Sequence, residues 1–231
     1  MRAFSLFATM ALVTFPALAA ETPPATISVM GEGRVEAAPD MATVALGVQT
    51  DADTAAAAMA ENSTKLAAVI ERLKAAGIEP RDIQTSGLSL GPRYDYGKQD
   101  GTPPTVVGYT ASNMVTVRVR ALDTVGTVLD GVVSGGANTL NGLSFGLADD
   151  RPLMDEARTE AVADAAAKAT LYAKAAGVTL GRVMTIAEAG GYAPPRPMAM
   201  EAGFAKAADV PVAPGELAVT ASVSVVYEIA D

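Results

Sequence analysis

The stretch LAVTASVSVVYEI, residues 217–229, decides the fold class because its apolar and polar side chains alternate with a period of two. One face of this predicted strand carries Leu217, Val219, Ala221, Val223, Val225, Tyr227 and Ile229. The other face carries Thr220, Ser222, Ser224 and Glu228. Since only one face is apolar, we expect a half-buried strand, which is typical of an antiparallel sheet with one solvated side.

The same alternation predicts three further strands. The first begins with Ile27 and Val29, and Pro39-Asp40 supplies the turn chemistry after it. The apolar faces of the other two are Ala42, Val44, Leu46 and Val48, and Val115, Val117 and Val119. Half-buried strands are therefore expected in both halves of the chain.

A first helix is predicted from apolar residues spaced three and four apart. Its stripe is Leu66, Val69, Ile70 and Leu73. Asp51 or Asp53 would cap its start, and Gly77 would adopt the left-handed conformation just past its end. A segment of this kind is expected to lie with its stripe on a sheet.

Two more helices follow. The second has the stripe Val125, Val128, Leu129 and Val132. Asp123 would cap it, and Gly135 would stop it. The third begins near Asp150, has Pro152 in its first turn and runs to Ala176. Because it is so rich in alanine, its buried face is expected to pack closely on a sheet.

The first and third helices end in similar sequences, KAAGI at 74–78 and KAAGV at 174–178. Each is followed by a strand, a loop rich in Tyr, Pro and Gly, and a second strand that begins TAS. This order predicts an internal duplication, with repeats at 51–120 and 150–229. The fold class is therefore α+β, with duplicated units of a long helix packed on an antiparallel-rich sheet and with long hairpin excursions.

The two excursions are longer than ordinary hairpin loops of 2–5 residues, which points to a role beyond connection. Aromatic residues among prolines and glycines are typical of interfaces, where one end of the ring packs and the other stays wet. We therefore predict that these loops carry the contacts of a homo-oligomer. The candidates are Tyr94, Tyr96, Pro103, Pro104, Tyr192, Pro194 and Pro195.

Residues 1–19 are predicted to be a cleavable signal peptide, which leaves residues 20–231 as the mature domain. Arg2 is followed by an apolar stretch, and Ala17-Leu18-Ala19 fits the small-x-small cleavage rule. The alternative is an uncleaved anchor, but the segment is short for a membrane span and contains Pro16. No later stretch is apolar enough to span, so we expect an exported, soluble protein without a transmembrane segment.

Composition excludes several kinds of chemistry. The chain has no Cys and no His, which removes the usual zinc sites, the Ser-His-Asp and Cys-His triads and histidine acid–base catalysis. Glu156 and Glu160 resemble a solvated helix face, and a hydrolase built on paired carboxylates would need two acids in one cleft. No catalytic constellation is visible, so neither enzymatic activity nor a cofactor is expected.

The net charge of −9 becomes more negative once Arg2 is removed with the signal peptide. Lys and Arg are not clustered, so the chain lacks the electrostatic footprint of a nucleic-acid-binding protein. The expected partner is the protein itself, and other envelope components stay open as partners.

Three motifs have a chemical and a structural interpretation. Gly31-Glu32-Gly33 lacks the third glycine and the helix start of a dinucleotide site, which favours close packing or a bulge. Asp149-Asp150 lacks the spacing of a calcium loop, which favours helix capping. Met198 and Met200 have thioethers spaced to bind Cu(I), or else they form an apolar surface for a partner. A ligand- or soft-metal-binding module is therefore the alternative function.

Several segments, in this order along the chain, carry a resemblance to a known family: 27–33 with Pro39-Asp40, 83–86, 108–113, 158–169, 194–202 and 219–223. On these segments the chain resembles the SIMPL-domain family, which includes bacterial periplasmic immunogenic antigens. The resemblance implies a periplasmic or envelope location, ring- or channel-like oligomers and an association with oxidative and envelope stress. It implies no enzymatic activity and no catalytic residues.

Overall fold

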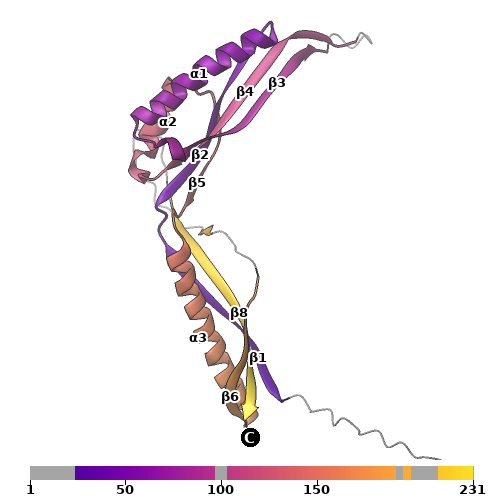
Figure 1. The fold of residues 1–231 in the computed structure, drawn as a ribbon, viewed down its shortest axis with the longest axis vertical. Helices are drawn as coiled ribbons and strands as arrows, with labels where there is room; N and C mark the ends of the chain where they lie inside the picture. The colour runs from indigo at the N-terminus through magenta and orange to yellow at the C-terminus, as the bar shows by residue number, and fades with distance from the viewer. Residues whose placement is uncertain (1–23, 97–102, 191–194, 199–212, 231) are drawn as a thin grey trace, which may run out of the picture.

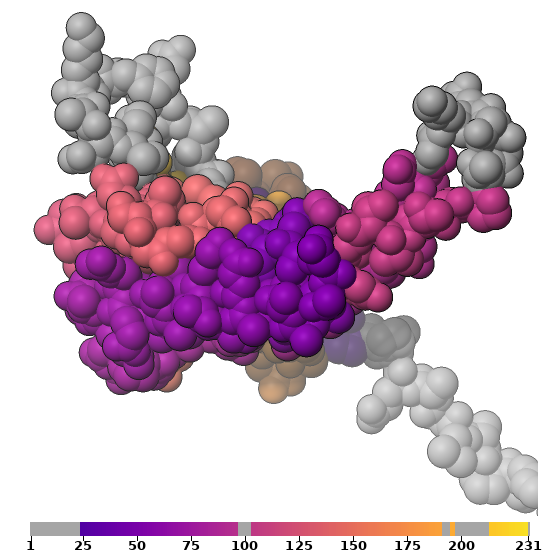
Figure 2. Space-filling model, turned by 90° about the horizontal axis from the view of Figure 1, so that it is seen from above, coloured from indigo at the N-terminus to yellow at the C-terminus, as the bar shows by residue number. Residues whose placement is uncertain are grey.

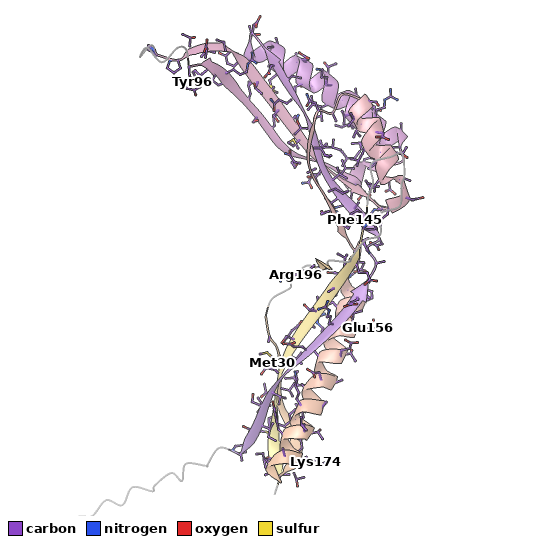
Figure 3. The ribbon with its side chains drawn as sticks, turned by 180° about the vertical axis from the view of Figure 1, so that it is seen from behind. Met30, Tyr96, Phe145, Glu156, Lys174 and Arg196 are labelled. Atoms are coloured by element: carbon purple, nitrogen blue, oxygen red, sulfur yellow. The ribbon has the colours of Figure 1, made fainter. Side chains whose placement is uncertain are left out.

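The computed structural model describes residues 24–96, 103–190, 195–198 and 213–230. They form two α+β lobes that stand end to end at an angle (Figure 1). The central lobe is built from residues 41–146, and the terminal lobe combines both ends of the described chain. Figure 3 shows Tyr96 at the far tip of the central lobe and Lys174 at the opposite end of the molecule.

The central lobe is a four-stranded antiparallel sheet with two helices on one face, and its strand order is β3-β4-β2-β5. Its strands are β2 (Met41–Ala52), β3 (Ile83–Asp95), β4 (Thr105–Val119) and β5 (Thr139–Gly146). Its helices are α1 (Ala55–Ala75) and α2 (Val125–Ser134), with the short 3-10 turns η1 (Pro80–Asp82) and η2 (Leu122–Thr124).

The core of the central lobe consists of the residues that the sequence predicts for it. The inward residues of β2 and β4 are at most 1 % exposed, and they are Ala42, Val44, Leu46, Val48, Val115, Val117 and Val119. They pack against the predicted stripes of α1 and α2. Each fully buried Val or Leu contributes about 1.5–3 kcal/mol, so these stripes explain why the helices lie on this face.

The terminal lobe is a second antiparallel sheet with one helix across it. Its elements are β1 (Thr26–Ala37), α3 (Arg151–Ala176), β6 (Thr179–Glu188), β7 (Arg196–Met198) and β8 (Glu216–Ala230). The strand order is β1-β8-β6, and β7 also pairs with β8. The alternation predicted for 217–229 is confirmed, because the odd-numbered residues from Leu217 to Tyr227 are buried, and those from Val219 to Tyr227 share a core with α3.

Helix α3 packs unusually close to the sheet. Its buried face is almost entirely alanine, namely Ala157, Ala161, Ala165, Ala169 and Ala173. A side chain on Gly31 would lie 2.0 Å from the carbonyl oxygen of Ala161, and one on Gly33 would lie 1.9 Å from that of Ala157. The close-packing interpretation of these two glycines is therefore confirmed.

The helix ends are partly as predicted. Gly77 and Gly177 both have positive φ, +85° and +71°, just past the ends of α1 and α3. The predicted N-cap of α1 is wrong. Thr54 is the capping residue, and its side chain accepts the hydrogen bond from the Ala57 N–H, while Asp51 still belongs to β2.

The cap predicted for α2 is also wrong. Asp123 lies in η2, and the residue that precedes α2 is Thr124, whose hydroxyl donates to the Ala121 carbonyl. Asp150 does hold the N-cap position of α3, but its side chain makes no capping hydrogen bond, and the Asp149 carboxylate accepts from the Arg151 N–H instead. Gly135 holds the C-cap position of α2. The predicted α+β class is confirmed, whereas the internal duplication stays a prediction.

The two lobes have separate cores and meet at a narrow junction. Phe145 packs against the central core, and Leu147, two residues on, packs against the terminal core. Figure 3 places Phe145 where the lobes meet. At this point the Asp40 N–H donates to the Gly146 carbonyl (3.1 Å), and the Asp40 carboxylate accepts from the Ala148 N–H (2.7 Å).

Within the residues that the structure describes, none of the helices is long and apolar enough to cross a membrane.

Candidate assembly surface

The hairpin formed by β3 and β4 extends beyond the rest of its sheet. These strands pair from Ile83↔Val117 out to Asp95↔Thr105, whereas β2 pairs with β4 only as far as Ala52↔Tyr109. Figure 2 shows the hairpin, in magenta, projecting clear of the body formed by α1 and α2. We call residues 88–96 and 103–109 the arm; residues 88–92 lie beside the part of β4 that still pairs with β2, which ends at Tyr109, and the rest extends past it.

The arm exposes several large apolar side chains to solvent. Its large apolar side chains range from 46 % exposed at Leu90 to 74 % at Tyr96, and the full set is Leu88, Leu90, Tyr94, Tyr96, Val106 and Val107. The rings of Tyr94 and Tyr96 lie 6.3 Å apart at 50°, a tilted pair of the kind that aromatic side chains favour. Exposed apolar groups gathered on one projecting element mark an interaction surface.

Polar contacts with the end of β2 hold the base of the arm. Arg93 forms an ion pair with Asp51 of β2 (3.2 Å), and the Thr110 hydroxyl donates to the same carboxylate. A side chain at Gly108 would lie 3.0 Å from the Ala52 carbonyl oxygen and 3.1 Å from the Arg93 guanidinium. The end of β2 is therefore held against both β3 and β4 at the base of the arm.

A buried polar brace holds the same region from the helix side. Asn62 of α1 is fully buried, and its Nδ2 donates to the carbonyls of Val48 (2.8 Å) and Ala111 (3.1 Å). The Thr50 hydroxyl donates to the Ala58 carbonyl (2.8 Å). Because buried polar groups are costly unless they are paired, this brace fixes α1 on β2 and β4 where the arm begins.

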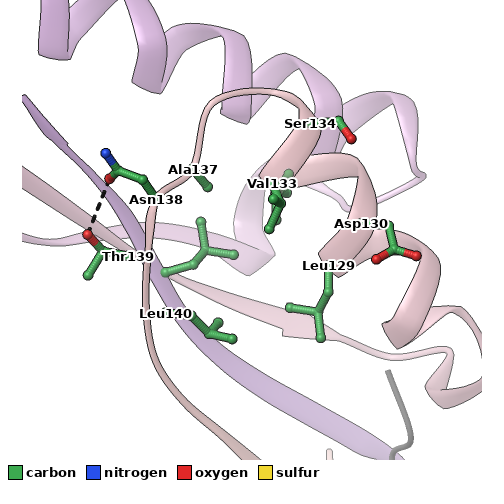
Figure 4. Close-up of a pocket in the computed structure, with 10 residues that line it drawn as sticks. Leu129, Asp130, Val133, Ser134, Ala137, Asn138, Thr139 and Leu140 are labelled. Atoms are coloured by element: carbon green, nitrogen blue, oxygen red, sulfur yellow. Dashed lines mark hydrogen bonds between the residues drawn. The ribbon is translucent and has the colours of Figure 1, made fainter. Parts of the chain in front are cut away.

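A cavity of about 520 Å³ lies at the other edge of the same sheet, between α2 and β5 (Figure 4). Its lining is mainly apolar and includes Leu46, Leu129, Val132 and Leu140, with Asp130 and other polar groups around it. Val133 and Leu140 are 63 % and 57 % exposed. The sequence offered one signal for this cavity, a valine at 133 that lies off the predicted stripe of α2.

The predicted contact residues are distributed unevenly. Tyr94 lies within β3 rather than in a loop, Tyr96 follows that strand, and Pro103 and Pro104 are exposed just before β4. Pro195 is partly buried just before β7. Tyr192 and Pro194 lie outside the described residues. Four further apolar residues share the arm with the two tyrosines but follow no sequence pattern that predicts a contact surface: Leu88, Leu90, Val106 and Val107.

The methionine candidates for Cu(I) are not tested by the structure. Met198 is the last residue of β7, and Met200 lies outside the described residues. Among the residues that the structure describes, no group of three or more Asp or Glu side chains is arranged to hold a metal ion. Soft-metal binding stays a prediction.

The terminal lobe, by contrast, closes one edge of its sheet. Asp164 and Glu160 of α3 accept from the N–H groups of Glu32 (2.9 Å) and Arg34 (3.1 Å) on the outer edge of β1. Lys168 donates to the Met30 carbonyl on the same edge (3.0 Å). A hydrogen bond from Lys168, followed by the one from the Glu32 backbone, holds the pKa of Asp164 below its usual value. Edges covered in this way are protected from pairing with other chains.

Residues 27–227 match the SIMPL family, described as "Protein of unknown function (DUF541)". The chain belongs to the SIMPL family. A "26 kDa periplasmic immunogenic protein" of Brucella melitensis biotype 1 is 44 % identical over 96 % of this chain and 95 % of its own length. The "Uncharacterized protein YggE" of Escherichia coli K12 is 34 % identical over 68 % of this chain and 62 % of its own length. The protein of the same name in Edwardsiella ictaluri is 35 % identical over 68 % and 64 %.

Proposed function

We propose that this SIMPL protein is a periplasmic assembly subunit that associates with itself through the arm. The periplasmic location follows from family membership, since the relatives that match along almost their whole length are named periplasmic proteins. The proposal also includes self-association, a ring- or channel-like assembly and a stress-related role in the envelope.

The observation that supports the arm is its combination of exposure and projection. The two tyrosines stand where the hairpin reaches past β2, and Leu88 and Leu90 are exposed on its edge strand, next to the braced base. Exposure of these apolar side chains to water is unfavourable. Their burial against a second surface would stabilise a complex by about 25 cal/mol per Å² of apolar area removed from water.

Another apolar surface competes with the arm. Val183, Met184 and Ile186 of β6 are 40–54 % exposed. Strand β6, however, has register shifts between Leu180 and Val183 and between Val183 and Thr185. Such bulges are a common way to blunt a sheet edge against pairing, so β6 fits a protected edge better than a contact surface.

The test is the solution mass of the chain from Ala20 onward, measured by size-exclusion chromatography with light scattering. We expect a discrete multiple of the subunit mass for the wild type and a monomer for the Tyr94→Ser/Tyr96→Ser variant. The matched control is Leu171→Ser/Tyr172→Ser, since these α3 residues are 63 % and 56 % exposed but lie on the other lobe. A monomeric wild type at micromolar concentration would contradict the proposal.

A further inference from the structure

We infer that the arm of one copy inserts into the cavity between α2 and β5 of a second copy. This inference rests on the proposed function, because it names the surface that receives the same arm.

The cavity and the arm are chemically complementary. Leu46, Leu129 and Leu140 supply an apolar lining, while Asp130 and Ser134 supply polar groups. A tyrosine has the matching shape, an apolar ring that ends in a hydroxyl which needs a hydrogen-bond partner when it is buried. The volume of about 520 Å³ lies within the roughly 300–1,000 Å³ that is usual for sites enclosing a bound group.

An arm cannot fill the cavity of its own chain. The arm continues β3 and β4, whereas β5 forms the opposite edge of the sheet in the order β3-β4-β2-β5. Thr139, in the cavity wall, pairs with Gly47, and the outermost pair of the arm is Asp95↔Thr105. Nine residues of strand separate these two levels, which is about 30 Å at 3.3 Å per residue. The occupant therefore comes from another copy.

The arm offers enough apolar surface to make this contact significant. Its six large apolar side chains are about half exposed or more, and together they present several hundred square ångströms. A stable interface buries roughly 800 Å² on each partner, so these side chains can supply the core of such an interface, which the flanking backbone completes.

The contact has a defined symmetry. Arm and cavity are different surfaces of one chain, so the interface is heterologous, and each copy can give one arm and receive one. Contacts of this kind close into a ring when the rotation between copies allows it. The same interface would therefore account for an assembly with more than two subunits.

The absence of cysteine from the chain makes a direct crosslinking test possible. Tyr96→Cys and, separately, Tyr94→Cys are each mixed with an affinity-tagged Val133→Cys variant, allowed to exchange subunits and treated with a short bis-maleimide. We expect a tagged–untagged dimer on a denaturing gel. The control replaces Val133→Cys by Leu171→Cys, which is equally exposed at 63 %.

The outcomes separate this inference from the proposed function. Crosslinking through Val133 well above the Leu171 control supports insertion of the arm. A wild type that assembles, with neither arm position crosslinking to Val133, overturns the inference and leaves self-assembly standing. A monomeric wild type overturns both.

A second measurement identifies a different occupant. The probe 8-anilinonaphthalene-1-sulfonate is added to the assembled wild type and to a Val133→Trp variant, whose indole would obstruct the cavity. We expect no cavity-dependent fluorescence from the wild type, because the arm occupies the site, and we expect Val133→Trp to be monomeric. Bright binding in an intact wild-type assembly that Val133→Trp abolishes would assign the cavity to a small apolar ligand and overturn the inference.

Discussion

At the scale of single residues, Gly31 and Gly33 set the distance between α3 and the sheet. The nearest atoms that a side chain at these positions would meet belong to the backbone of α3, which cannot rotate away as a flexible side chain could. The alanine face of α3 and the two glycines of β1 therefore act together, because small residues on both elements allow the helix and the sheet to approach closely.

Replacing Gly33→Ala should destabilise the terminal lobe by about 1–3 kcal/mol, because it overpacks this contact. The measurement is urea unfolding followed by circular dichroism. Gly146→Ala is the matched control, since Gly146 also lies in a strand but a side chain there would meet nothing within 4 Å. Equal stability of the two variants would show that α3 is not held as closely as the structure indicates.

Asp82 gives a second prediction, for the dependence of stability on pH. Its side chain is only 3 % exposed, and it accepts two hydrogen bonds of 2.8 Å from Arg120. The hydrogen bonds from Arg120 hold the pKa of Asp82 below its usual value of 3.8. A carboxyl whose pKa is lower in the folded than in the unfolded state stabilises the fold above the unfolded pKa and loses that contribution as the pH falls through the folded pKa.

Asp82→Asn should therefore lower the melting temperature at pH 7, and its difference from the wild type should shrink below about pH 4, near the pKa of an unfolded aspartate. Thermal unfolding of both proteins between pH 2 and pH 7 provides the comparison. Asp53→Asn changes an exposed residue in the same lobe, so its melting temperature should stay close to that of the wild type at every pH. A constant loss in Asp82→Asn across the whole range would show that the ion pair is not the source of the effect.

At the scale of elements, the two sheets differ in how their edge strands are covered. Helix α3 seals the outer edge of β1 with Glu160, Asp164 and Lys168, whereas β3 carries the exposed arm. Under the proposed self-association, this division would direct contacts toward the central lobe, because an open β1 edge would offer a competing site for strand pairing.

Opening the seal tests its role. In Glu160→Ala/Asp164→Ala, the Glu32 and Arg34 amides lose their acceptors, so hydrogen exchange in residues 30–36 should become faster and the protein should form larger, irregular species. Mass spectrometry of the exchanged peptides and light scattering measure the two effects. Glu71→Ala, an exposed helix position in the other lobe, is the control. Unchanged exchange at β1 would exclude the seal.

The elements also show what the sequence could predict. The strand at 217–229 and helix α3 follow from periodicity, because burial on one face imposes a pattern that local sequence carries. Exposure of Val106 depends instead on β2 ending before the hairpin does, and exposure of Leu88 depends on β3 being the edge of the sheet. No local pattern records either condition. The cap of α1 was misassigned because Asp51, Asp53 and Thr54 compete within four residues, and tertiary contacts with Arg93 and Thr110 hold Asp51 in the strand.

At the scale of the whole molecule, two cores joined by a narrow junction should behave as two cooperative units. The chain crosses between lobes at residues 38–40 and 147–150, and the core clusters share no residue. Calorimetry of the Tyr94→Ser/Tyr96→Ser variant, which the proposed function expects to be monomeric, should show two transitions. Adding Gly33→Ala should lower only the transition of the terminal lobe, and adding Asp82→Asn should lower only that of the central lobe, because each substitution affects one core. A single transition that both substitutions shift equally would mean that the junction couples the lobes into one folding unit. The angle between them would then be a rigid feature of each subunit, and the arm would be presented in a fixed direction from the terminal lobe.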